Sequence, residues 1–183
     1  YDFARLMDGA DELSCSAFHE GRFRPRLSRV HAYVWDREGL SVPMMCQHCT
    51  HPPCVDVCPT GASFKRADGI VLVDKHICIG CRYCMMACPY KARSFVHEPA
   101  TDQKPHAPRG MGTVEACTMC VHRVDAGRMP ACVEACGGAG REAMLFGDLN
   151  DPQSEIAKRV ATYRTTRLRA DLGCEPGVYY RNI

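Results

Sequence analysis

Hydrophobic residues occur along this chain in short groups, and no apolar run approaches the roughly 20 residues that a membrane-spanning helix needs. The apolar group at residues 85–87, for example, ends at Cys88. Between residues 62 and 73, two short apolar or alternating segments flank an Asp68-Gly69 turn. This pattern predicts a β-hairpin.

The remaining stretches are polar or rich in turn residues. Residues 99–112 contain several Pro and Gly residues and predict an extended linker. Asn150, Asp151 and Pro152 give a helix start. Basic residues follow on what we expect to be a solvated helix face: Lys158, Arg159, Arg164, Arg167 and Arg169.

Composition excludes some classes of protein and singles out one residue type. The chain has 183 residues, with 46% hydrophobic residues, 24% charged residues and a net charge of +2, so it is neither a disordered tail nor a nucleic-acid binder held by bulk charge. With 15 Gly, 12 Pro and only short apolar segments, its hydrophobic core should be thin. The 14 cysteines are the excess that could stabilise it.

Disulfides, zinc and iron–sulfur clusters are the three ways in which cysteines could do so. Disulfides need an oxidising compartment. No signal peptide is visible, which disfavours disulfides and leads us to expect a cytoplasmic location. The spacing of the cysteines bears on the choice between zinc and iron–sulfur clusters.

Two cysteine motifs stand close together in the middle of the chain. CIGCRYCMMACP has the spacing C-x2-C-x2-C-x3-C-P of bacterial ferredoxins that hold 4Fe-4S cubanes, and Pro89 should stop any continuing helix. CQHCTHPPCVDVCP is a C-x2-C-x4-C-x3-C-P variant. A zinc site needs only four ligands, so two neighbouring motifs that each end in C-x3-C-P favour iron–sulfur clusters. The ligands are Cys46, Cys49, Cys54, Cys58, Cys78, Cys81, Cys84 and Cys88.

In two-cluster ferredoxins, the fourth cysteine of each motif binds the cluster of the other motif. This exchange predicts two ligand sets here. One set is Cys46, Cys49, Cys54 and Cys88, and the other is Cys58, Cys78, Cys81 and Cys84. For residues 46–96 the motifs therefore predict a two-cluster ferredoxin lobe.

A third motif follows the linker, with the spacing C-x2-C-x11-C-x3-C: Cys117, Cys120, Cys132 and Cys136. Its exchange partner should lie near the N-terminus, where only Cys15 is present. Counting back from Cys15 by the ferredoxin spacing reaches Asp11, Asp8 and Arg5 instead of cysteines. We interpret Cys15 as the surviving fourth cysteine of a lost motif.

The exchange rule gives Cys15 to the cluster of Cys117, Cys120 and Cys132. Cys136 would serve the lost cluster, so we expect it to be a free thiol. Three clusters with four ligands each then take 12 of the 14 cysteines and leave Cys136 and Cys174. Since deleting an inner cluster would interrupt the series, we place the lost site at one end.

Nearly the whole chain resembles the four-cluster ferredoxin-type electron-transfer subunits of molybdenum and tungsten bis-pterin oxidoreductases, such as those of dimethyl sulfoxide reductase and formate dehydrogenase. The resemblance includes the cysteine motifs and three further segments: residues 15–21 (CSAFHEG), 146–155 (FGDLNDPQSE) and 172–180 (LGCEPGVYY). The absent first motif is a departure from this family. A three-cluster form is similar to the small subunits of tungsten enzymes of the aldehyde oxidoreductase type, in particular of tungsten-dependent class II benzoyl-CoA reductases.

The resemblance implies an electron-transfer subunit without catalytic residues of its own. Its partners would be a large subunit with a tungsten or molybdenum bis-pterin cofactor, and a ferredoxin or further electron-transfer subunits, with no nucleic acid and no membrane span. Two alternatives are a freestanding ferredoxin-like carrier and a cysteine-rich zinc-binding module.

The expected fold class is α+β, with two tandem ferredoxin-like lobes of small antiparallel sheets and short helices, held together by the clusters. Residues 1–45 and 97–150 would form the lobe with one cluster and one lost site. Residues 46–96 would be inserted as the two-cluster lobe, and residues 151–183 would form a C-terminal helix and tail.

Overall fold

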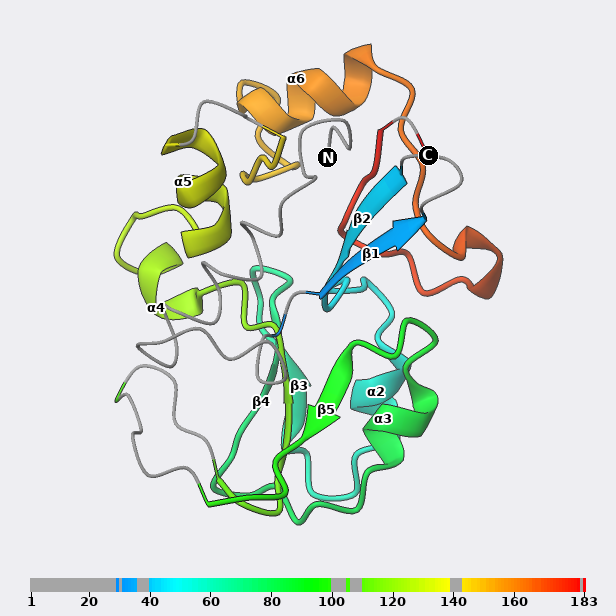
Figure 1. Ribbon diagram of the computed structural model, residues 1–183, viewed down its shortest axis with the longest axis vertical. Helices are drawn as coiled ribbons and strands as arrows, with labels where there is room; N and C mark the ends of the chain where they lie inside the picture. Colours follow the sequence, from blue (N-terminus) through cyan, green and yellow to red (C-terminus); the bar gives the residue numbers. More distant parts are fainter. Residues whose placement is uncertain are drawn as a thin grey trace.

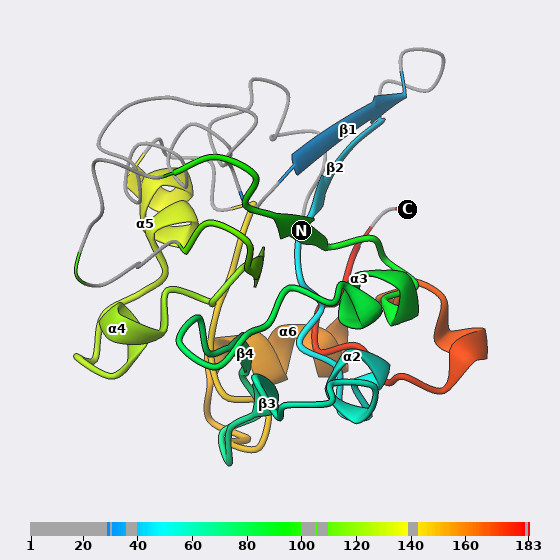
Figure 2. The same cartoon turned by 90° about the horizontal axis from the view of Figure 1, so that it is seen from below.

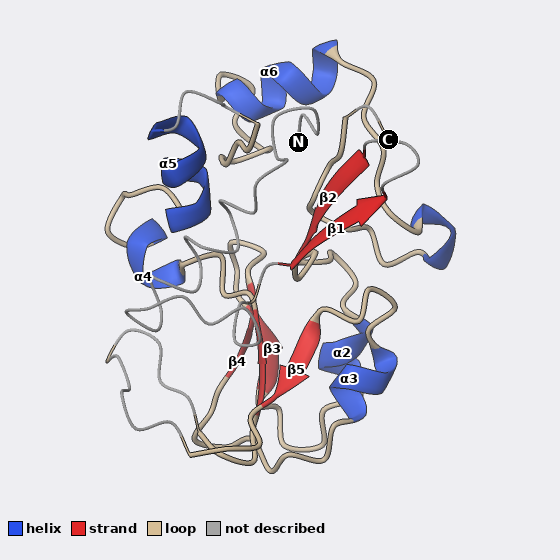
Figure 3. Cartoon of the chain, viewed as in Figure 1, coloured by secondary structure: helices blue, strands red, loops and turns tan. Residues whose placement is uncertain are grey.

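The structure is a computed structural model, and it describes residues 29, 31–35, 40–99, 105, 110–138, 143–181 and 183. The described strands form three two-stranded antiparallel sheets (Figure 1): β1 (His31–Trp35) with β2 (Leu40–Met44), β3 (Ser63–Lys65) with β4 (Val71–Val73), and β5 (Arg93–Phe95) with β6 (Val114–Ala116). The helices are short: α2 (Pro53–Asp56), α3 (Tyr83–Ala87), α4 (Val121–Val124), α5 (Ala131–Gly138), α6 (Glu155–Thr162) and one 3-10 turn (Ala170–Leu172). Small sheets and short helices confirm the α+β class at this coarse level (Figure 3).

The predicted β-hairpin is confirmed. Strands β3 and β4 pair in antiparallel register, with Ser63 opposite Val73. The turn closes through a hydrogen bond from the Gly69 N–H to the Arg66 carbonyl, and Gly69 has the positive φ that such a turn requires.

Helices α2 and α3 follow directly from the two central cysteine motifs and lie side by side (Figure 2). Pro53 opens α2 at a position where a missing N–H costs nothing. α3 ends at Ala87, and Pro89 follows Cys88 as the predicted helix stop. These two short helices carry Cys54 and Cys84 as their buried residues.

Strand β5 connects the central motifs to the third one, because it pairs with β6 immediately before Cys117. Arg93 lies opposite Ala116 in this register. The pairing joins residues on both sides of the expected lobe boundary at residues 96 and 97. The division into tandem lobes therefore stays a prediction.

The hydrophobic core is divided among small clusters that contain the cysteines. One cluster gathers Met45, Cys46, Cys117 and Met144 around the fully buried Tyr180. Two smaller clusters centre on Cys88 with Cys174 and on Cys54 with Cys84. The thin core that the sequence predicted is thus built around the thiols.

The C-terminal helix is shorter than the basic stretch suggested. α6 begins after Ser154, whose Oγ accepts a hydrogen bond from the Ala157 N–H at 3.2 Å, and it ends at Thr162. Beyond it the chain is extended, and Thr166 pairs with Tyr180. The arginines from Arg164 onward therefore lie outside the helix. The prediction that all five basic residues share one helix face is wrong. In the part of the chain that is described, no helix has the length and apolarity to cross a membrane.

Candidate iron–sulfur sites

The thiols of the first predicted ligand set come together in the structure, and we call this group site A: Cys46, Cys49, Cys54 and Cys88. All four side chains are buried. Every pair among them interacts electrostatically, although the four residues come from two separate motifs. Cys88 thus lies near the first three cysteines of the other motif, where the predicted exchange would put it. Cys54 also lies near Cys84 of the second set, so the exchange stays a prediction.

Site A is a place where protonated thiols are the stable form in the protein alone. Burial raises the pKa of Cys46 to about 11, and burial together with the neighbouring Cys46 raises the pKa of Cys49 to about 12. Iron binds the thiolate, so loading the site must displace these protons. Four convergent buried thiols fit a cubane, whose metal charge replaces the missing protons.

The second predicted ligand set lines one small pocket beside α3, and we call it site B: Cys58, Cys78, Cys81 and Cys84. Cys81 is exposed to solvent, while Cys84 is buried. The Cys58 Sγ accepts a hydrogen bond from the Ser63 N–H at 3.3 Å. Burial raises the pKa of Cys58, but this N–H and the Thr60 hydroxyl outweigh it and hold the pKa below its usual value. Site B thus faces solvent at one edge.

The loops that carry the thiols turn sharply at left-handed residues. His48, Arg82 and Met119 have positive φ values of 42°, 66° and 53° and stand between ligands of their motifs. At Gly80 the chain also comes very close to another segment, because a Cβ there would lie 2.1 Å from the Gly112 carbonyl oxygen. Only glycine fits this position.

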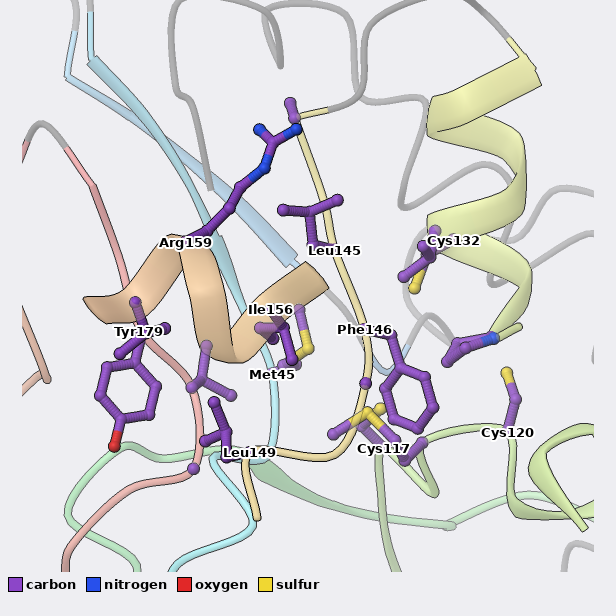
Figure 4. A pocket seen from close by; sticks show the side chains of 18 of the residues that line it. Met45, Cys117, Cys120, Cys132, Leu145, Phe146, Leu149, Ile156, Arg159 and Tyr179 are labelled. Atoms are coloured by element: carbon purple, nitrogen blue, oxygen red, sulfur yellow. The ribbon is translucent and has the colours of Figure 1, made fainter. Parts of the chain in front are cut away.

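The third motif lines a cavity of about 340 Å³, which we call site C: Cys117, Cys120 and Cys132. Figure 4 shows these three thiols around the cavity, with Phe146 beside Cys117. Cys120 and Cys132 come from opposite ends of a segment that contains α4, and α6 closes the cavity with Ile156. The predicted fourth ligand, Cys15, and the relic positions Arg5, Asp8 and Asp11 lie outside the described residues.

Cys136 lies outside the cavity that the other three cysteines of its motif line. Its side chain is buried in the same core cluster as Cys117. Its Sγ accepts a hydrogen bond from the Ala143 N–H at 3.2 Å. Within the described residues, no three or more His, Cys, Asp or Glu side chains form a group that could hold a single metal ion.

The non-ligand segment at residues 172–180 binds the loop of site A. The Thr50 N–H donates to the Glu175 carbonyl at 2.9 Å, and the Gly177 N–H donates to the Gln47 carbonyl at 2.8 Å. A Cβ at Gly177 would lie 3.0 Å from the His48 carbonyl oxygen, so the two backbones need this close approach. The Tyr180 hydroxyl completes the contact by accepting from Gln47 Nε2 at 3.1 Å. This segment therefore secures the loop that carries two ligands of site A.

Two buried polar side chains next to sites A and B have incomplete hydrogen bonding. His48 Nδ1 accepts from the Val71 N–H at 3.0 Å, which leaves its proton on Nε2, and burial lowers its pKa to about 4. Nε2 has no partner among the described residues, and the three side-chain nitrogens of Arg93 have no oxygen acceptor there. The motifs gave no reason to single out Arg93. The only sequence signal is a basic residue in a short strand just after the last cysteine of the central pair.

Comparison with known proteins gives a family and several relatives. Residues 38–149 match the model of a 4Fe-4S dicluster domain. The chain is 46% identical to the Hdr-like menaquinol oxidoreductase iron-sulfur subunit 1 of Archaeoglobus fulgidus, over 94% of this chain and 70% of that protein. It is 43% identical to a tetrathionate reductase subunit of Salmonella typhimurium, over 90% of this chain and 62% of that protein.

A third relative, from Halobacterium salinarum, is provisionally named as an iron-sulfur subunit of dimethyl sulfoxide reductase. It is 47% identical over 76% of this chain and 54% of its own length. The chain thus spans between about half and 70% of these relatives. The resemblance to iron–sulfur subunits of this class, first seen in the cysteine motifs, is confirmed.

Proposed function

This chain belongs to the 4Fe-4S dicluster domain family, and from that premise we propose that it is an electron-transfer subunit with three 4Fe-4S clusters, docked to a larger catalytic subunit. The observation that carries the proposal is the grouping of the thiols. Sites A and B each gather cysteines from both central motifs, and site C gathers three cysteines of the third.

Each bound cluster would supply one-electron redox chemistry, since a 4Fe-4S cubane held by four thiolates changes its charge by one. The chain itself contributes thiols, loops that hold them, and control of exposure. Burial of the site A thiols and exposure of Cys81 at site B give the two sites different contact with solvent. An electron path would then have a shielded interior and an edge at the surface.

The ligand set of the third cluster is Cys15, Cys117, Cys120 and Cys132. The exchange rule supports this assignment, and so does the place of Cys136, which lies outside the cavity and accepts the Ala143 N–H. Paired substitutions test it directly. Cys15→Ser should remove about four iron atoms per chain, and Cys136→Ser should remove none. Loss of a cluster from Cys136→Ser would overturn the assignment and the count of three.

For the partner, we propose a large subunit with a tungsten or molybdenum bis-pterin cofactor. The names of the three relatives support the general class, since two of them are named as subunits of reductases and one as a subunit of an oxidoreductase. The narrower hypothesis of tungsten-dependent benzoyl-CoA reduction is supported only by the missing first motif. It stays a prediction, as do the expected cytoplasmic location and the lobe boundaries.

Anaerobic purification of the chain from its own cells tests the partner. We expect a large subunit to co-purify in fixed stoichiometry, with tungsten or molybdenum found by elemental analysis and the pterin by its fluorescent oxidation product. Recovery of the cluster-loaded chain alone would contradict this assignment and favour a freestanding ferredoxin-like carrier. Zinc in place of iron and sulfide would instead favour a zinc-binding module.

A further inference from the structure

Arg93 stands out because its guanidinium is buried without any of the usual acceptors. The residue is 7% exposed, and its Nε, Nη1 and Nη2 atoms have no oxygen acceptor among the described residues. A buried cation normally has a carboxylate or several carbonyl groups beside it, because losing water costs several kcal/mol per ion. The other buried arginines of the described segments follow that rule: Arg123 pairs with Glu134 and donates to the Met129 carbonyl, and Arg29 pairs with Glu115.

The groups that face Arg93 are thiols of two different sites and the imidazole of His48. Arg93 interacts electrostatically with Cys46 and Cys54 of site A and with Cys84 of site B. β5, which carries Arg93, packs against α3, which carries Cys84, and α3 packs against α2 with Cys54. The guanidinium therefore lies where ligands of both sites meet.

From this placement we propose that Arg93 raises the reduction potentials of the clusters at both site A and site B. Its fixed positive charge and its N–H donors face the cluster ligands of both sites. The inference rests on the ligand sets proposed above. Reduction adds one negative charge to a cluster, and a neighbouring cation favours the more negative state. Arginine suits this role because its charge persists on burial and its planar group offers five N–H donors in a fixed fork.

The two sites should therefore respond together to a change at Arg93, and by more than site C. A unit charge in contact with a ligand thiolate, at an effective dielectric constant of about 20, changes a one-electron equilibrium by well over tenfold. We expect Arg93→Met to lower the reduction equilibrium constants of both clusters by about tenfold or more, equivalent to about 59 mV each. Arg93→Lys keeps the charge and should stay within about threefold of the wild type.

The test is a potentiometric titration of the whole chain, followed by electron paramagnetic resonance, with iron and sulfide measured on every sample. The signal of site C is identified as the one lost in Cys120→Ser. Arg66→Met is the matched control, because the Arg66 guanidinium is already paired with Asp125 at 2.7 Å and with Asp68 at 2.8 Å. It should leave all three potentials unchanged.

Two results would overturn the proposal with the clusters intact: unchanged potentials in Arg93→Met, or an equal shift of all three clusters. If sites A and B of Arg93→Met do not take up their clusters, the potentials of Arg93→Lys test the role of the charge. A loaded Lys variant with potentials near the wild type supports the role of the charge, and a shift as large as about tenfold refutes it. Failure of the ligand sets themselves is a separate result, seen as iron contents that do not follow the cysteine substitutions.

Discussion

Removing one hydroxyl group, in Tyr180→Phe, tests the contact between the C-terminal segment and the loop of site A. The Tyr180 ring is fully buried, and phenylalanine keeps its shape and apolar contacts. The hydroxyl donates to the Pro43 carbonyl at 3.1 Å and accepts from Gln47 Nε2 at 3.1 Å. The substitution thus removes two buried hydrogen bonds and keeps the ring.

Each such bond contributes about 1 kcal/mol net. Only the bond to Gln47 joins the C-terminal segment to the loop, because Pro43 lies in β2, so the contact should weaken by about 1 kcal/mol. Gln47 keeps its second bond, from Nε2 to the Met45 carbonyl at 3.0 Å. If the loop between Cys46 and Cys49 must open before iron leaves site A, a loss of about 1 kcal/mol makes the open state about 5-fold more populated, and iron should leave site A about 5-fold faster.

The assay is anaerobic transfer of ferrous iron to a coloured chelator, followed as a multiphase time course. Tyr180→Phe should accelerate one phase, of about four iron atoms, and leave the others unchanged. The matched control is Tyr179→Phe, since Tyr179 is only half-buried and its ring lies 5.5 Å from the Arg167 guanidinium carbon. Equal release rates in wild type and Tyr180→Phe would refute the idea that residues 172–180 hold the loop of site A.

Two further substitutions test local features of the fold. Gly80→Ala should clash with the Gly112 carbonyl and reduce loading of site B, measured as a loss of up to about four iron atoms per chain. Gly69→Ala is its control, because φ is also positive at Gly69 but no atom lies within 4 Å of the added Cβ. A Gly80→Ala chain with full iron content would show that the close approach at this loop is not needed. Ser154→Ala should lower the free energy of unfolding by about 1 kcal/mol through loss of the N-cap of α6, measured by thermal denaturation. Thr162→Ala, at the other end of α6, should lower the free energy of unfolding by less. A larger effect of Thr162→Ala would contradict the capping role.

The local features of the central region could be predicted because they follow from spacing and turn chemistry. The Asp68-Gly69 turn specifies its hairpin from neighbours in sequence, and Pro89 cannot continue a helix. The exchange of Cys58 and Cys88 is likewise expected from motif spacing. It stays a prediction, supported by the place of Cys58 in the site B pocket and of Cys88 near Cys46.

Contacts between distant segments could not be predicted in the same way. The pairing of β5 with β6 joins residues on either side of the linker, and no local pattern specifies that register. The length of α6 was overestimated because charge spacing alone does not show that Thr166 pairs with Tyr180 in an extended chain. The place of Arg93 beside the cluster ligands could not be predicted either, because most of the thiols that face it are far away in sequence.

The central claim is that the chain holds three 4Fe-4S clusters. The most direct measurement is the iron and acid-labile sulfide content of the wild-type chain, purified anaerobically and quantified per chain by amino-acid analysis. We predict about 12 iron and about 12 sulfide, four of each for sites A, B and C. About eight of each would show that one of the three sites holds no cluster, and about 16 would show that a fourth site exists. Either result would contradict the claim.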